Sequence, residues 1–184
     1  MSFTLYDATV PLFIDSLNTL LTLLAKAEEH AAEKGIDISS LLQARLAENM
    51  HPLTFQYHVA TDTAMKTITR IIDVKPEPYL NDLKDVTDLR ARIKHTIDLV
   101  KDASKHVFEA RADSYIPLAF PHLEEDLQIK ATDYIRAYSI PNFFFHVQTA
   151  YCILRSQGVQ LGKADFLGAS ISPFLEEHQR KQKK

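Results

Sequence analysis

The feature that most restricts the fold of this chain is a predicted helix that begins near Pro141, ends at Gly158 and is apolar on almost every side. At about 100° per residue, its main stripe consists of Phe143, Val147, Ala150 and Leu154. Phe145 and Cys152 lie on the other side of the helix. A helix that is apolar on both flanks is usually enclosed by other helices, so this segment predicts the centre of a helical bundle.

The same helix carries a narrow polar line formed by Asn142, His146 and Thr149. A polar side chain buried without a partner costs roughly 1–3 kcal/mol. The line must therefore find partners on a neighbouring helix or face a cavity. We take these three residues as the first candidates for a binding site.

Composition supports a single all-α domain. The chain has 184 residues, of which 46% are hydrophobic and 24% charged, and only four are glycine. A chain of this length can bury a core without disulfides or metals. We expect one helical domain over residues 1–175 and a polar, frayed tail over residues 176–184.

Charge and cysteine content exclude several classes of partner. The net charge of -3 gives no electrostatic reason to expect nucleic acid. Cys152 is the only cysteine, so no disulfide can form within the chain, and a reducing compartment is expected. The N-terminal region has no basic segment, and no apolar run approaches about 18 residues. We therefore expect a cytoplasmic protein that does not span a membrane.

Three further long helices are predicted from the 3.6-residue period. The first covers residues 4–34. The second opens at Ser40, which forms a capping box with Gln43, and it bends at Pro52. The third covers residues 87–111.

The connections between these helices differ in kind. Residues 74–85 contain two prolines and are predicted to be an irregular connector. Residues 115–120 and 127–131 alternate between apolar and polar side chains, which predicts a small hairpin or an extended crossover between the third and fourth helices. A last segment is expected over residues 171–179. Four long amphipathic helices joined in this way predict a four-helix bundle.

The second helix supplies polar residues that could meet the line on the fourth. His58 and Asp62 lie one turn apart, the same spacing as Asn142 and His146. If the two helices face each other, these four side chains converge and could bind a small molecule between the second and fourth helices. In the simpler interpretation, His58 and Asp62 form a solvated pair and His146 is a core histidine.

Other candidate groups have simple structural explanations. Tyr151 could line the pocket, or it could pack on Arg155 one turn later. Cys152 is interpreted as a buried packing residue without a chemical role. Lys163, in a loop flanked by glycines, could stand at a cavity mouth or pair with Asp165. No GxSxG, HExxH or P-loop motif is present, so the sequence does not decide whether the protein is an enzyme.

Three segments resemble a known family. They are LYDATVPLFIDSLNTL (5–20), RLAENMHPLTFQYHVATDTA (45–64) and PNFFFHVQTAYCILRSQGVQLGKADFLG (141–168). They look like the DUF1993 family of uncharacterised proteins, and the resemblance covers residues 5–168. That family in turn resembles the DinB/YfiT-like superfamily of four-helix bundles, which implies a DinB-like bundle fold.

The resemblance also bears on metal binding. Many DinB-like proteins bind a divalent metal through one histidine of the second helix and an HxxxH pair of the fourth. Here Asn142 and Ala150 stand four residues from His146, so the pair is incomplete, while His51 or His58 could be the second-helix ligand. We therefore expect no cofactor. If zinc or nickel does bind, the expected ligands are His58, Asp62 and His146.

Three functions remain open at this stage. The first is binding of a small ligand, with the candidate residues His58, Asp62, Asn142, His146, Thr149 and Tyr151. The second, implied by the resemblance, is a metal-dependent transferase or hydrolase. The third is a structural interaction module that forms a homodimer through an apolar helix face.

Overall fold

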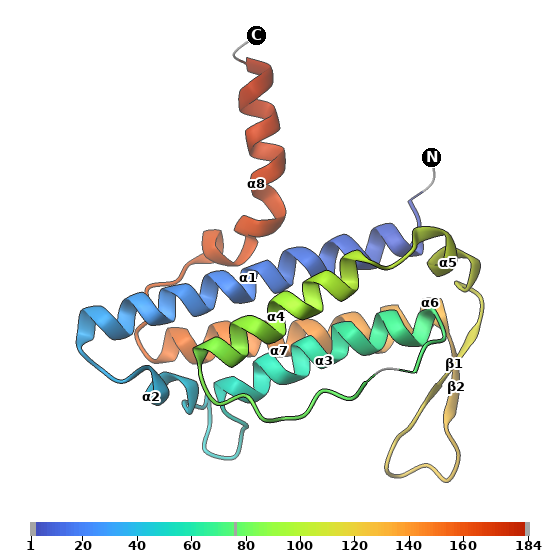
Figure 1. The fold of residues 1–184 in the computed structure, drawn as a ribbon, viewed down its shortest axis with the longest axis horizontal. Helices are drawn as coiled ribbons and strands as arrows, with labels where there is room; N and C mark the ends of the chain where they lie inside the picture. Colours follow the sequence, from blue (N-terminus) through green and yellow to red (C-terminus); the bar gives the residue numbers. More distant parts are fainter. Residues whose placement is uncertain (1–2, 76, 183–184) are drawn as a thin grey trace.

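Four long helices run side by side in the computed structural model, which describes residues 3–75 and 77–182 (Figure 1). They are α1 (Leu5–Lys34), α3 (Leu53–Ile71), α4 (Val86–Lys101) and α7 (Ile140–Ser156). α3 packs against α7 on one side and α4 on the other, and α1 closes the bundle against α4 and α7. The predicted four-helix bundle is confirmed.

Shorter elements connect and extend these helices. They are α2 (Ile38–Leu42), α5 (Lys105–Ala110), β1 (Tyr115–Leu118), β2 (Leu127–Lys130), α6 (Ala131–Tyr134), the π-helical turn η1 (Ile135–Ser139) and α8 (Lys163–Gln182). β1 and β2 pair in antiparallel fashion, with Ile116 opposite Ile129. The hairpin expected between the third and fourth bundle helices is therefore present.

α1 has clear signals at both ends. The Thr4 hydroxyl accepts a hydrogen bond from the Asp7 N–H, and the Asp7 carboxylate accepts one from the Thr4 N–H, which completes a capping box. Gly35 ends the helix with a φ of 63°, a left-handed conformation that glycine adopts at little cost. These caps explain why the predicted boundaries of the first helix agree with the structure.

The predicted second helix was wrong in its first part. Asp37, not Ser40, caps the short helix α2, and its carboxylate accepts a hydrogen bond from the Ser39 N–H. Residues 43–52 lie outside the helices, and α3 begins only after Pro52. Proline disfavours the helical conformation of the residue before it, so Pro52 starts a helix here rather than bending one.

The third and fourth helices also differ from the predicted ranges. The third is interrupted after Lys101, and Ser104 caps α5 as a separate short helix. The fourth begins earlier than predicted, because α6, η1 and α7 follow one another without a break from Ala131 to Ser156. Pro141 therefore lies inside a longer helical segment, two residues after the last π-helical residue, Ser139.

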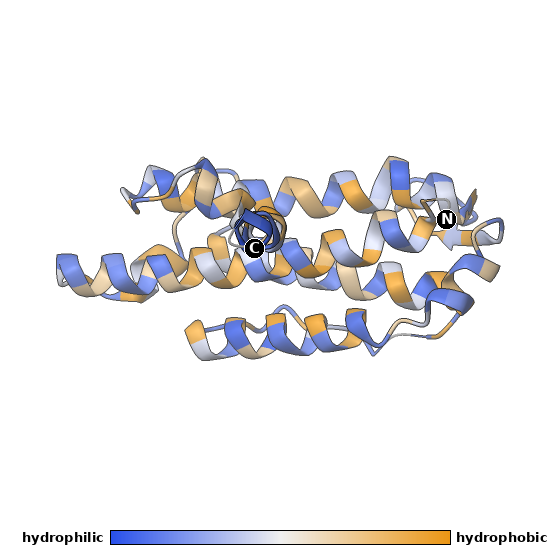
Figure 2. Cartoon of the chain, turned by 90° about the horizontal axis from the view of Figure 1, so that it is seen from above, coloured by the Kyte–Doolittle hydropathy of each residue, from blue (hydrophilic) through white to orange (hydrophobic). Residues whose placement is uncertain are grey.

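The core lies where the four helices meet. Hydrophobic residues, in orange, recur along the bundle helices that supply it (Figure 2). Phe143, Val147 and Leu154 of α7 are fully buried, as the sequence predicted. The Phe13 and Phe143 rings lie 4.7 Å apart across the α1–α7 contact. One part of α7 is open, however, because Phe145 is 56% exposed.

α8 extends the chain beyond the bundle. Its first turns pack on α1, while the rest of the helix projects away from the four-helix body (Figure 1). None of its described side chains is buried. The helix continues to Gln182, through most of the segment expected to be a frayed tail.

α1 is long and apolar enough to cross a membrane by length and composition alone. Half of the relevant window is buried inside the bundle. This burial is what the core helix of a bundle requires, so the hydropathy of α1 is explained by packing.

Candidate functional site

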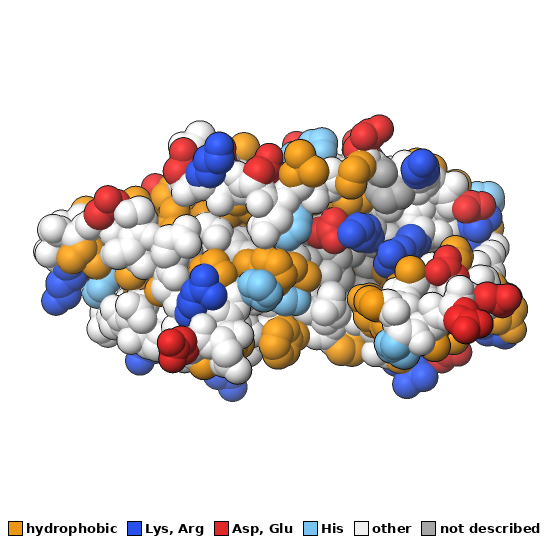
Figure 3. Space-filling view, turned by 90° about the horizontal axis from the view of Figure 1, so that it is seen from below, with side chains coloured by type: hydrophobic (Ala, Val, Ile, Leu, Met, Phe, Trp, Pro, Cys, Tyr) orange, Lys and Arg blue, Asp and Glu red, His pale blue; other side chains and the backbone are white. Residues whose placement is uncertain are grey.

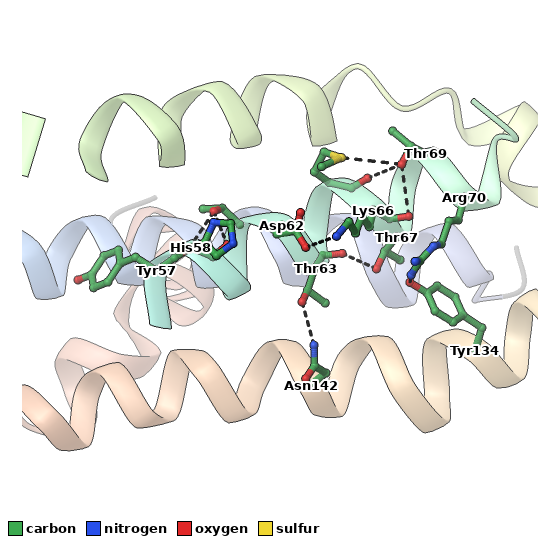
Figure 4. Close-up of polar contacts among 12 residues, drawn as sticks. Tyr57, His58, Asp62, Thr63, Lys66, Thr67, Thr69, Arg70, Tyr134 and Asn142 are labelled. Atoms are coloured by element: carbon green, nitrogen blue, oxygen red, sulfur yellow. Dashed lines mark hydrogen bonds and ion pairs between the residues drawn. The ribbon is translucent and has the colours of Figure 1, made fainter. Parts of the chain in front are cut away.

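Four side-chain hydrogen bonds join α3 to the helical segment that contains α7, and we call them the α3–α7 ladder. Its rungs are Gln56–His146, Thr63–Asn142, Thr67–Ser139 and Arg70–Tyr134. Figure 4 shows the part of the ladder around Thr63 and Arg70. As the residue number rises on one side it falls on the other, so the ladder follows the antiparallel packing of the two helices.

His146 is held as a neutral imidazole. Its Nδ1 lies 2.8 Å from Gln56 Oε1, and the Gln56 amide nitrogen donates to the carbonyl of His51, 3.1 Å away. Because Oε1 can only accept, Nδ1 carries the proton. Burial, reinforced by the nearby His51 and His58, lowers the pKa of His146 to about 4.

The other polar residues of α7 have separate partners. Asn142 Nδ2 donates to Thr63 Oγ1 at 2.9 Å, whereas the Thr149 hydroxyl donates to the Phe145 carbonyl within its own helix. Tyr151 packs edge-on against Phe166 of α8. Asn142 thus faces α3, while Thr149 and Tyr151 have other contacts.

The loop after α7 places its charged residues elsewhere. Lys163 is exposed at the first residue of α8. Asp165 accepts a hydrogen bond from the Gly162 N–H and lies 3.5 Å from Lys26 of α1. The Lys163–Asp165 pair that the sequence suggested is not formed.

A polar cleft of about 120 Å³ lies beside the ladder, between α3 and the segment that contains α7. Its polar lining consists of Asp62, Thr63, Lys66, Arg70, Tyr134, Tyr138 and Asn142. Viewed from below, acidic, basic and histidine side chains gather near the middle of the molecule (Figure 3). The cleft lies between the second and fourth bundle helices, and of the six candidate ligand-binding residues only Asp62 and Asn142 line it.

The charges in the polar cleft are not fully balanced. Lys66 Nζ lies 2.6 Å from Asp62 Oδ2, so these two residues neutralise each other. Arg70 Nη1 lies 3.0 Å from the Tyr134 hydroxyl, a neutral partner. Among residues 3–75 and 77–182, no carboxylate forms an ion pair with Arg70. The cleft therefore contains one compensated pair and one uncompensated cation.

A second polar group lies on the α4 side of α3, and we call it the connector cluster. Its members are His58, Asp62, Tyr79, Asp82 and Arg92. The Arg92 guanidinium lies 4.3 Å from the centre of the Tyr79 ring, and its Nη2 donates to Asp82 Oδ1 at 3.1 Å. The Tyr79 hydroxyl in turn lies 3.2 Å from Thr96 Oγ1 of α4.

His58 and Asp62 behave differently from the predicted pair. Asp62 uses Oδ2 for Lys66, and neither Asp62 Oδ1 nor His58 Nδ1 has a hydrogen-bond partner, although both atoms are buried. Burial lowers the pKa of His58, and the negative charge of Asp62 only partly offsets this effect. The two residues therefore share a site without bonding to each other.

The residues present do not fit the three-histidine metal site of DinB-like proteins. The Phe55 ring packs against the relevant imidazoles, with its centre 3.9 Å from the ring centre of His51, 6.1 Å from that of His58 and 6.2 Å from that of His146. In the described part of the chain, no three His, Cys, Asp or Glu side chains are arranged to hold a metal ion. The alternative set of His58, Asp62 and His146 does not form such a group either.

The sequence analysis did not identify the α3 residues of the ladder or the residues of the connector cluster outside α3. Gln56, Thr63, Thr67 and Arg70 recur at positions i, i+7, i+11 and i+14, which places them on one face of α3. This spacing can be recognised in the sequence, and it could have predicted a polar face on α3 that contacts α7. No comparable signal identifies Arg92, since an arginine on an amphipathic helix is usually solvated.

Comparisons with known proteins match the chain over most of its length. The model of a domain of unknown function, DUF1993, matches residues 5–167. The crystal structure of a DinB family member protein from Shewanella denitrificans is similar, with 33% sequence identity and a TM-score of 0.80. The similarity covers 89% of this chain and 91% of that one. No curated protein matches.

Proposed function

This chain belongs to the DUF1993 family and has the fold of a DinB family member, and from that premise we propose that it binds a small anionic molecule in the polar cleft. The family description assigns no function, so the proposal depends on the chemistry of the cleft. The observation that carries it is the uncompensated charge of Arg70.

Arg70 has the properties of an anion-binding residue. Its guanidinium is planar, always charged and able to donate two parallel hydrogen bonds to a carboxylate or a phosphate. Its only side-chain hydrogen-bond partner in the described structure is the neutral hydroxyl of Tyr134. A bound anion would balance a charge that the protein itself leaves unbalanced.

The rest of the cleft can recognise the remainder of such a ligand. The Asn142 amide and the Tyr138 hydroxyl can each form hydrogen bonds, and the Lys66–Asp62 pair offers a donor and an acceptor. A volume of about 120 Å³ admits only a small group. We therefore expect a compact carboxylate or phosphate compound rather than a large cofactor.

A titration with inorganic phosphate and with succinate tests this proposal. Isothermal calorimetry would compare the wild type with Arg70→Gln, after circular dichroism has shown that the variant is folded. Arg136→Gln is the matched control, because Arg136 lies in the neighbouring π-helical turn, is largely exposed and pairs with Asp133.

We expect at least one of the two anions to bind the wild type and Arg136→Gln alike. Arg70→Gln should bind it at least tenfold more weakly, since each 1.4 kcal/mol of lost interaction is a factor of ten. Binding that survives unchanged in folded Arg70→Gln, or no binding of either anion to the wild type, would contradict the proposal.

A second candidate function, a homodimeric interaction module, is favoured by α8. Phe174 and Leu175 are 66% and 52% exposed on a helix that projects from the bundle. Light scattering of the full chain and of a Phe174→Ser, Leu175→Ser variant tests this function. A dimeric wild type and a monomeric variant would support it, whereas a monomeric wild type would exclude it.

No reaction is assigned to the chain. A metal-dependent transferase or hydrolase would need ligands that the described residues do not bring together. A cytoplasmic location remains our proposal, supported by the single, unpaired Cys152.

A further inference from the structure

A hollow with a largely apolar lining lies between the C-terminal parts of α3 and α4, and we call it the apolar hollow. Its volume is about 470 Å³. The apolar residues of its lining are Ile68, Ile72, Val74, Leu99 and Ala103. A concave, mostly apolar surface with a few polar groups is the usual form of a small-molecule site. This hollow therefore offers room and apolar surface for a ligand that the polar cleft is too small to hold.

The hollow lies where two helices end side by side. Ile72 is the C-cap of α3 and Asp102 is the C-cap of α4, and both residues line it. The chain turns after Ile72 at Asp73, which has a φ of 61°. Arg111 holds this turn, because its Nε donates to the Ile71 carbonyl at 2.7 Å and its Nη2 lies 3.1 Å from Asp73 Oδ2. The α3 wall of the hollow is thus fixed by contacts within the protein.

The polar edge of the hollow is acidic. Asp98 and Asp102 both line it and lie one turn apart on α4, a spacing that makes their side chains neighbours. Among residues 3–75 and 77–182, neither carboxylate forms an ion pair. Lys94 and Lys101 of the same helix do not line the hollow. The third titratable residue of its described lining is His95, whose ring packs on Tyr79 with the ring centres 6.0 Å apart.

The charge at this edge determines which ligands suit the hollow. The C-terminal ends of the two helices add partial negative charge to that of the two carboxylates. None of the described residues in the lining is a lysine or an arginine. An exposed carboxylate by itself is commonly just hydrated, but two of them beside an apolar hollow match a ligand that is apolar at one end and positively charged at the other.

We propose that the apolar hollow is a second small-molecule site, which binds an amphipathic organic cation of the primary amine class. The ammonium group donates to Asp98 and Asp102, since it has three N–H donors and no acceptor. The hydrocarbon part lies against Ile68 and Leu99, where its apolar surface leaves water. This site is separate from the polar cleft, which is lined by Arg70 and suits an anion.

Cyclohexylmethylamine, cyclohexylmethanol and cyclohexanecarboxylate are probes with the same hydrocarbon ring and different charges. Methylammonium supplies the charged head without the ring. Amide chemical shifts of the intact chain at pH 7 report both affinity and place, and the largest shifts are expected at Ile72 and Ala103. A ligand of about eight heavy atoms should bind with a dissociation constant of about 1 mM. We expect the amine to bind at least about fivefold more tightly than the alcohol or methylammonium, and the carboxylate most weakly.

A double variant tests the role of the two carboxylates. Asp98→Asn with Asp102→Asn removes the charge and keeps the side-chain shape, so amine and alcohol should bind this variant within about twofold of each other. Alcohol binding equal to that of the wild type shows that the hollow is intact. Glu29→Gln with Glu33→Gln is the matched control, because it removes two exposed carboxylates of α1 that do not line the hollow. This control should keep the full preference for the amine.

Four outcomes would overturn the inference. They are no binding of any probe, an amine that binds no more tightly than the alcohol, methylammonium that binds as tightly as the full amine, and an amine preference that survives in the Asp98, Asp102 double variant. Phosphate should bind that double variant and the wild type alike. Loss of phosphate binding in Arg70→Gln therefore tests the proposed function separately, and either proposal can fail while the other stands.

Discussion

The Gln56–His146 contact shows how one buried residue sets the chemistry of a helix interface. The Gln56 side chain is 2% exposed, and its amide nitrogen is occupied by the carbonyl groups of His51 and Pro52. Its oxygen is therefore turned toward α7, where it accepts a hydrogen bond from His146 Nδ1–H. A histidine held in this way is a neutral hydrogen-bond donor at neutral pH.

Stability should fall when the solution is acidified below about pH 6.5. The pKa of His146 is about 4 in the folded chain, against about 6.5 in an unfolded one, so the unfolded chain takes up the proton first. The stabilising effect is complete above pH 6.5 and is lost as the pH falls toward 4, by at most about 1.4 kcal/mol per pH unit. The pKa of His58 is also lowered, so it acts in the same direction.

Urea unfolding at pH 7 and at pH 5 measures this effect. In His146→Asn, the amide can still donate to Gln56 but cannot titrate, so the loss of stability between the two pH values should be smaller than in the wild type. An equal loss in both proteins would show that His146 does not control the pH dependence.

A double-mutant cycle can identify the partner of His146. We expect Gln56→Leu and His146→Leu to be coupled by about 1 kcal/mol, the usual size of a buried hydrogen bond. Asp62→Asn and His146→Leu should be additive within about 0.5 kcal/mol, because no contact joins these residues. Strong coupling of His146 to Asp62 would restore the arrangement first expected from the sequence.

Part of the site could be predicted from single residues and part could not. The polar line of Asn142 and His146 was predicted from its angular position, and its partners do come from the second bundle helix. The partners are Gln56 and Thr63 rather than His58 and Asp62, because the side of α3 that meets α7 depends on packing of the whole bundle. Helical periodicity fixes the relative angles of residues on one helix but not the rotation of that helix against its neighbour.

At the scale of elements, the errors in the second and third predicted helices concern interruptions. The apolar period continues through residues 43–52 and through residues 102–104, although neither stretch is helical. Pro52 and Ser104 interrupt the helices here, because proline disfavours a helical residue before it and serine caps a new helix. The apolar pattern alone does not indicate either effect. The π-helical turn before α7 has no sequence signal that we recognise. The hairpin was predicted because its alternation of apolar and polar residues is itself a local signal.

The central position of α7 leads to a prediction about stability. Leu154 is fully buried, so Leu154→Ala should lower the free energy of unfolding by about 2–5 kcal/mol through loss of buried surface and formation of a cavity. Phe145→Ala is the matched control, since Phe145 lies on the same helix but is 56% exposed. Chemical unfolding of both variants measures the difference. A similar small loss in both would show that α7 is not the core of the bundle.

At the scale of the whole molecule, the bundle keeps the DinB-like fold while the histidine geometry differs from a three-histidine site. Purified protein should contain well under one equivalent of zinc or nickel, because the described residues bring no three His, Cys, Asp or Glu side chains together around one position. Elemental analysis after dialysis against a metal-containing buffer measures this content. One tightly bound equivalent that is lost in His146→Ala would contradict the prediction and favour the enzyme alternative.

The α3–α7 ladder also has a consequence for the order of events during folding. Its four rungs join residues that lie 64, 72, 79 and 90 positions apart in the chain. Each requires closure of a long loop, and the entropy of that closure must be lost before the contact stabilises anything. We infer that the ladder forms after the main folding barrier. Substitutions in it should then accelerate unfolding while leaving the refolding rate nearly unchanged, so the ladder would determine how long the native bundle persists.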